Sequence, residues 1–280
     1  MRIVTTVAEM QSVCRELRMK GSVLGIVPTM GALHEGHLSL VRRARSECDT
    51  VVASIFVNPL QFAPGEDLAK YPRTFEEDCK LLEAESVDVL FAPEAAEMYP
   101  NGSVTTVTVS EVGDRLDGAS RPGHFAGVAT VVAKLFHVVG PARAYFGQKD
   151  AAQLAVLRQM VRDLNFDVEL VSCAIVRDKD GLALSSRNKY LSATEREQAL
   201  VLHRTLLRLE RMIAEGERQS ITLVQRGMET LNAVAGIRVD YLAIVDAGTL
   251  LPATSAETGT LVAVAAYVGS TRLIDNFLVA

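Results

Sequence analysis

The sequence predicts an α/β protein with a Rossmann-like parallel sheet domain and a smaller C-terminal α+β domain. Strand-like apolar runs alternate with helical patterns through about the first 170 residues, which is typical of a parallel sheet flanked by helices. Beyond Asn188 the pattern changes to two long helical stretches and then two strand-like runs. We therefore predict a nucleotide- and substrate-binding domain over residues 1–175 and a lid domain over 176–280.

Individual elements follow from hydrophobic periodicity and from capping signals. Pro28 is expected to end the first strand, because proline has no N–H for a sheet ladder. Three T/S-x-x-E patterns, beginning at Thr6, Thr74 and Ser192, predict helix starts with capping boxes. The runs predict strands at 23–27, 51–57, 87–93, 142–146, 166–172, 239–246 and 260–268, and long helices at 194–215 and 221–234.

Composition narrows the class of protein. The chain has 280 residues, of which 49% are hydrophobic and 22% are charged, as in an ordinary globular protein. A formal net charge of -5 without a basic tract argues against a nucleic-acid partner. The four cysteines are scattered without a CxxC pair, and no apolar run is long enough to cross a bilayer. We expect free thiols, no membrane association and a cytoplasmic location.

The segment PTMGALHEGH, residues 28–37, has the pattern of a strand, a glycine-bearing loop and a helix. Gly31 and Gly36 allow close approach of an anion, and free amides at the helix start carry partial positive charge toward it. His34 and His37 can donate hydrogen bonds to phosphate oxygens. In the alternative interpretation one histidine caps the helix and the other lies on the surface. A zinc site is disfavoured, because HEGH lacks two histidines at i and i+4.

Four further segments place polar side chains beside turn-forming residues after an apolar strand, where open α/β sheets bind ligands. Lys149 can neutralise phosphate as a point charge, and Asp150 can accept hydrogen bonds from a ribose. Each segment has an ordinary alternative as a turn, a helix cap or a linker. The side chains concerned are Asn58 and Gln61; Arg121 and His124 with Gly127; Lys149, Asp150 and Gln153 with Gly147; and Ser185, Ser186 and Arg187.

Together these segments resemble the pantoate-β-alanine ligase (pantothenate synthetase) family, within the nucleotidyltransferase superfamily with its paired-histidine loop. PTMGALHEGH, FVNPLQF, YPRT, RPGHFAGV, FGQKD, DGLALSSRN and TRLIDN occur in the family's order, so the resemblance covers nearly the whole chain. Two departures are the AAQ at 151–153, where the family often has a bulkier residue and a second glutamine, and Gln148, which is often glutamate. Neither removes a charged group assigned to phosphate.

The resemblance implies ATP-dependent condensation of pantoate with β-alanine through pantoyl adenylate, releasing pyrophosphate and AMP. It implies Mg²⁺ as cofactor, a homodimer formed through the N-terminal domain, and catalytic roles for His34, His37, Lys149 and Arg187, with His37 as proton donor. Asp78 is our candidate metal ligand, although the acidic run 76–78 is also typical of a solvated helix face. The implied ATP site comprises Met30, Gly31, His34, His37, Gly147, Lys149, Asp150, Val176, Leu184, Ser185, Ser186 and Arg187; Gln61 and Gln153 would bind pantoate, and Gln61 also β-alanine.

Two other functions are compatible with the residues alone. The first is a nucleotidyltransferase that transfers AMP or CMP to a phosphorylated alcohol without a ligation step. The second is an inert nucleotide-binding module that has kept the fold. Retention of both histidines, Lys149 and the SSRN segment argues against the second alternative.

Overall fold

A computed structural model describes the chain from Met1 to Ala280 and divides it into two compact units. The first unit comprises Met1–Gly147 and Val156–Ala174, and the second comprises Gln148–Ala155 and Ile175–Ala280. Residues 148–155, which our prediction placed in the first domain, thus belong to the second unit. Asn276 of the second unit donates hydrogen bonds to the backbone carbonyls of Gln148 and Lys149 in this segment.

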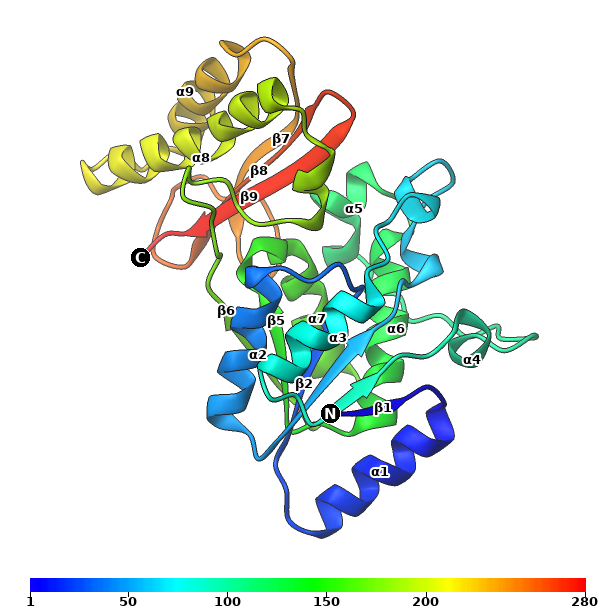
Figure 1. Ribbon diagram of the computed structural model, residues 1–280. Helices are drawn as coiled ribbons and strands as arrows, with labels where there is room; N and C mark the ends of the chain where they lie inside the picture. The colour runs from blue at the N-terminus through cyan, green and yellow to red at the C-terminus, as the bar shows by residue number, and fades with distance from the viewer. The chain divides into compact units, whose positions relative to one another are not determined.

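The first unit contains a six-stranded parallel sheet in the order β1-β4-β3-β2-β5-β6, which confirms the predicted α/β class (Figure 1). Helix α1 packs with α6, and α2 packs with α3. The strands are β1 (Arg2–Val4), β2 (Leu24–Thr29), β3 (Thr50–Ile55), β4 (Val89–Phe91), β5 (Arg143–Gly147) and β6 (Glu169–Cys173). The α-helices are α1 (Val7–Met19), α2 (Glu35–Glu47), α3 (Phe75–Ala84), α4 (Ala95–Met98), α5 (Asp117–Ser120), α6 (His124–Val139) and α7 (Ala151–Asp163). The first residues of α7 belong to the second unit and the rest to the first.

Strand β2 continues through Pro28 to Thr29, so the prediction that Pro28 ends the strand was wrong. The carbonyl of Thr29 accepts a hydrogen bond from the amide of Phe56, just after β3, whereas the carbonyl of Leu24 accepts one from Ala142, just before β5. Because strand residues alternate, Pro28 faces the β5 side, where the pairing ends at Ile26. Proline therefore ends only the ladder with β5, and β2 remains paired with β3 as far as Thr29.

The strand order of the first sheet reverses between β2 and β5. In open α/β sheets, ligands bind beyond the carboxyl ends of the strands at such a point. The paired-histidine loop leaves the carboxyl end of β2, and Gly147 ends β5. The topology therefore places the candidate phosphate loop at the expected binding edge.

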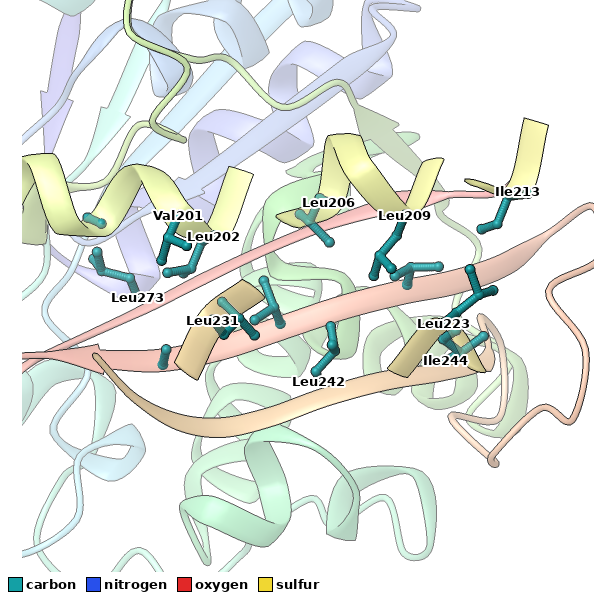
Figure 2. Close-up of a cluster of buried hydrophobic side chains, with 14 of the residues drawn as sticks. Val201, Leu202, Leu206, Leu209, Ile213, Leu223, Leu231, Leu242, Ile244 and Leu273 are labelled. Atoms are coloured by element: carbon teal, nitrogen blue, oxygen red, sulfur yellow. The ribbon is translucent and has the colours of Figure 1, made fainter. Parts of the chain in front are cut away.

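The second unit is built on an antiparallel sheet of β7 (Ile237–Asp246), β8 (Thr260–Val268) and β9 (Thr271–Leu278). Its core lies between this sheet and the helices α8 (Ala193–Ala214) and α9 (Ser220–Asn232), as Figure 2 shows. Leu206 and Leu209 from α8 and Leu231 from α9 are buried there against Leu242 and Ile244 of β7. The short 3₁₀ helices of the chain are η1 (Pro59–Gln61), η2 (Asp67–Ala69), η3 (Val112–Asp114), η4 (Gln148–Asp150) and η5 (Ser186–Tyr190).

The three predicted capping boxes have different outcomes. Ser192 and Glu195 form the complete box at the start of α8. Thr6 caps α1 by accepting a hydrogen bond from the amide of Glu9, whose side chain instead pairs with Arg2. Thr74 starts α3 without capping it, because its hydroxyl donates to Asp78, and so that prediction was wrong for the box.

Candidate active site

The paired histidines cap helix α2 together. His34 is the N-cap residue, and its Nδ1 accepts a hydrogen bond from the amide of Gly36 at 3.1 Å. Nδ1 of His37 in turn accepts one from the amide of His34 at 3.3 Å, and the ring centroids are 4.1 Å apart. The alternative is right that a histidine caps the helix, and wrong that the second lies apart on the surface, because both rings take part in the cap. Because each Nδ1 accepts a hydrogen bond from a backbone amide, it carries no proton, and the neutral rings have their N–H at Nε2.

Most backbone N–H groups of the loop already donate hydrogen bonds within the protein. Gly31 donates to the hydroxyl of Thr29 at 3.1 Å, and Ala32 and Leu33 donate to the carboxylate of Asp78 at 2.9 and 2.8 Å. The amide of His37 bonds to the carbonyl of His34. The expectation of free amides that cradle an anion is therefore wrong for these positions. The expected phosphate contacts of this loop are therefore the side chains of His34 and His37.

Asp78 fastens the loop and is not placed as a metal ligand. Its side chain is 1% exposed, and its two oxygens accept the loop amides and, on Oδ1, the hydroxyl of Thr74 at 3.2 Å. Gly31 has φ +80°, and a Cβ there would lie 3.1 Å from Asp78 Oδ2. A buried carboxylate bonded in this way does not fit a metal ligand, and the metal prediction is corrected for this reason. The alternative of a solvated helix face holds for Glu76 and Glu77, which are exposed, but not for Asp78.

Asp78→Asn tests this structural role. The amide would turn an N–H donor toward one of the two loop donors, so we expect the free energy of unfolding to fall by about 1–3 kcal/mol without any metal present. Chemical denaturation in buffer containing a chelator measures it. Glu77→Gln is the control, because Glu77 is exposed one residue away on the same helix. An unchanged stability combined with a weaker response to Mg²⁺ would restore the metal role.

Gln61 is held in the first unit by a buried neighbour. Asn58 is 1% exposed and donates to the Gln61 Oε1 at 3.1 Å and to the carbonyl of Gly127 at 3.0 Å, while its own oxygen accepts the hydroxyl of Tyr99 at 2.8 Å. The Gln61 amide approaches Met30 Sδ at 3.0 Å, which brings two predicted ligand residues together. Gly127 permits this packing, because a Cβ there would meet the Leu60 carbonyl oxygen at 2.2 Å.

The backbone carbonyl of Gln61 is held by a hydrogen-bonded series of three side chains, Glu66, Arg121 and His124. Arg121 donates two hydrogen bonds to Glu66, at 2.7 and 2.6 Å, and approaches Nε2 of His124 at 3.0 Å. Because Nε2 accepts from the guanidinium, Nδ1 of His124 carries the proton and donates to the carbonyl of Gln61 at 2.8 Å. Glu66 and Tyr99 were not anticipated from the sequence, since their partners lie 55 and 41 residues away.

His124 makes stability depend on pH. Burial, and then the charge of Arg121, lower the pKa of His124 from 6.5 to about 4. The folded protein therefore binds this proton less readily than the unfolded chain, and stability is lost as the pH falls from 6.5 toward 4. The shift corresponds to at most about 3 kcal/mol.

The variant His124→Asn tests this expectation, because its amide retains a donor near Nδ1 but does not titrate. We expect a smaller loss of unfolding free energy between pH 7 and pH 4.5 than in the wild type, measured by urea denaturation. His137→Asn removes an exposed histidine of the same helix and serves as control. Parallel pH dependence in the wild type and in His124→Asn would contradict the assignment.

The second unit carries the other predicted site residues. Lys149 lies in η4 with its side chain 20% exposed, and its Nζ is 3.8 Å from a carboxylate oxygen of Asp150. Gln153 is half-buried in the first turn of α7. This segment thus presents a cation, a carboxylate and an amide within five residues of each other in sequence.

Residues 176–187 form an ordered hairpin and helix rather than a flexible linker. The amide of Leu184 donates to the carbonyl of Val176 at 3.0 Å, and Arg177 bridges to Ala183. The hydroxyl of Ser185 then caps η5 through the amide of Arg187 at 3.3 Å. Val176, Leu184, Ser185, Ser186 and Arg187, all predicted ATP contacts, therefore belong to one folded segment.

The comparison with protein families decides between the possible functions. The family described as Pantoate-beta-alanine ligase matches residues 2–278. The chain belongs to the pantoate-β-alanine ligase family. It is an enzyme of that class, and the resemblance found in the sequence is thereby confirmed.

Pantoate-β-alanine ligases of known sequence and structure match the chain over nearly its full length. The pantothenate synthetase of Acidobacterium capsulatum is 60% identical over 289 aligned positions, covering 99% of this chain and 97% of the relative. That of Koribacter versatilis is 58% identical, covering 99% and 96%. The crystal structure of pantothenate synthetase from Thermus thermophilus superposes with a TM-score of 0.95 at 52% identity, covering 100% and 99%.

A solved pantoate-β-alanine ligase with bound substrates is also similar. The Francisella tularensis enzyme, described as complexed with beta-gamma ATP and beta-alanine, matches with a TM-score of 0.80 at 35% identity, covering 99% of this chain and 97% of that one. No helix of the present chain is long and apolar enough to cross a membrane.

Proposed function

We propose that this protein condenses pantoate with β-alanine at the expense of ATP. The observation that carries the assignment is the family match over residues 2–278. In the first step a carboxylate oxygen of pantoate attacks the α-phosphorus of ATP, and the bond to the β-phosphate breaks to release pyrophosphate. In the second step the uncharged amine of β-alanine attacks the acyl carbon, AMP leaves, an amide forms and the amine gives up a proton.

The first step requires positive potential and hydrogen-bond donors, because a carboxylate approaches a polyphosphate and negative charge grows on the departing pyrophosphate. We assign these contributions to His34, His37, Lys149 and Arg187. The capping bonds favour a neutral donor role for both histidines, because a second proton on Nδ1 would break a bond to a backbone amide. We therefore revise His37 from a proton donor to a hydrogen-bond donor through Nε2.

The remaining predicted contacts are divided between the nucleotide and pantoate. We assign the triphosphate and nucleoside to the loop around Gly31, to Val176 and to residues 184–187, and pantoate to Gln61 and Gln153. Asn58 and the Arg121–His124 pair support this, because they hold Gln61 by three hydrogen bonds, one to its Oε1 and two to its backbone carbonyl. The second step needs no covalent nucleophile, since the adenylate is already activated and exclusion of water protects it. The lid role of 176–280 stays a prediction.

We keep Mg²⁺ as a cofactor that the triphosphate itself would bring. Magnesium prefers oxygen ligands and is commonly bound through substrate phosphates and water. Asp78 does not fit as its ligand, because its carboxylate is buried and bonded to the loop. No step above depends on the metal.

We also infer a homodimer and a cytoplasmic location. The dimer rests on the family resemblance, and light scattering on the purified protein tests it. The location is supported by four cysteines that are all unpaired, as is usual in a reducing compartment.

Release of AMP tests the function directly. A mixture of ATP, pantoate and β-alanine should yield AMP and pantothenate, and ATP with pantoate alone should exchange labelled pyrophosphate into ATP. Omission of pantoate should abolish both signals. Exchange that requires a phosphoalcohol and ignores pantoate would overturn the proposal, as would saturable ATP binding without turnover.

A further inference from the structure

Strand β9 (Thr271–Leu278) carries two adjacent buried polar residues that face opposite sides of the second sheet. Asp275 and Asn276 are 3% and 2% exposed, and adjacent strand residues point to opposite faces. Leu273 packs into the core under α8 and α9, and Asp275 lies on the same side of the strand. Asn276 therefore points to the face that these helices leave uncovered.

The side chain of Asn276 binds the backbone that carries Lys149. Its Nδ2 donates to the carbonyl of Gln148 at 3.0 Å and to that of Lys149 at 2.9 Å. Its Oδ1 accepts from the Gln148 side chain at 3.2 Å. Both amide protons and the oxygen of one side chain are thus used on two consecutive residues, 127 and 128 positions away in sequence.

These bonds determine where the Lys149 ammonium can reach. Fixing two successive carbonyls fixes the peptide planes on both sides of the Lys149 Cα, and hence the direction of its Cα–Cβ bond. A lysine side chain has four rotatable bonds, so an unanchored backbone would spread its Nζ over several positions. Electrostatic stabilisation is effective only when the charge is already in place as negative charge develops.

We propose that Asn276 is a positioning residue that holds Lys149 for the adenylation step, an inference that rests on the proposed function. Asn276 touches no substrate and acts through the backbone of Lys149. Asp275 anchors the hairpin of residues 176–184 in a similar way, because it accepts two hydrogen bonds from Arg177 at 2.6 and 2.9 Å. The closing residues of the chain thereby order both nucleotide-binding segments of the second unit.

Asn276→Asp is the principal test, with Asn276→Ala beside it in case the first variant folds poorly. The aspartate keeps the volume but directs a carboxylate oxygen at two carbonyls. We expect kcat for pantoate-dependent pyrophosphate exchange to fall by about 10- to 100-fold, the scale of a small misplacement of a catalytic group. Leu273→Ala, a destabilising change on the same strand without contact to Lys149, should lower the melting temperature and leave kcat within about twofold.

A double-mutant cycle separates positioning from general stability. If Asn276 acts through Lys149, Asn276→Asp should cost less than about threefold once Lys149 is alanine, because the group it orients is gone. Equal losses in the two backgrounds would overturn the inference, as would near-wild-type kcat in both Asn276 variants or a matching loss in Leu273→Ala. Absence of exchange in the wild type would instead refute the proposed function, so the two failures are distinguishable.

Discussion

Replacing His37 with alanine is expected to slow adenylation by about two to four orders of magnitude, the range for a lost transition-state hydrogen-bond donor. The ring has two separate tasks. Its Nδ1 holds the amide of His34, and its Nε2–H is directed to the phosphates in our proposal. Pantoate-dependent pyrophosphate exchange measures the loss without involving β-alanine.

Two matched variants separate these tasks at His37. In His37→Asn the side-chain oxygen can replace Nδ1 as the cap, so stability should stay close to that of the wild type while exchange remains slow. In His37→Gln the amide can reach the position of Nε2, so part of the exchange rate should return while the helix start is weakened by about 1 kcal/mol. Near-normal exchange in His37→Asn would refute the role given to Nε2.

Lys149→Ala should lower the adenylation rate by a similar factor of about 10² to 10⁴, because a single compact ammonium opposes the charge on the departing pyrophosphate. The ammonium acts on negative charge that develops in the transition state, so its loss should be felt mainly in kcat. Lys149→Arg should recover little, since a planar fork cannot replace a point charge at the same position.

Lys179→Ala is the control for this change. Lys179 lies exposed in the hairpin of the same unit, and its loss alters the net charge by the same amount. Exchange kinetics at low and moderate ionic strength should show a small, salt-sensitive effect for Lys179→Ala and a large, salt-insensitive one for Lys149→Ala. Equal behaviour of the two variants would assign Lys149 to general attraction of the nucleotide.

The α/β architecture could be predicted because its signals are local. Five of the strands in the first sheet and the helices α8 and α9 correspond to runs with clear periodicity. Strand β1 has only three residues, and β9 interrupts its apolar residues with Arg272, Asp275 and Asn276, so neither presents a strong pattern. Those polar residues are explained only by partners far away in sequence.

The candidate site was predictable in its residue types and less so in its geometry. The sequence identifies His34, His37 and Lys149 as groups suited to phosphate, but it does not reveal which histidine nitrogen is taken by the backbone. Asp78 shows the same limit, because a buried carboxylate that binds two loop amides reads in sequence as part of an acidic helix face. Such assignments depend on contacts between segments that no local pattern encodes.

The shared cap of helix α2 makes this helix start a poor target for protein engineering. Serine, threonine or aspartate would ordinarily improve an N-cap, and a stability screen would select them at His34. Each would discard the ring whose outer nitrogen we assign to the nucleotide. Thermostability and turnover are therefore coupled through the same two imidazoles, and a more robust variant has to be sought elsewhere in the chain.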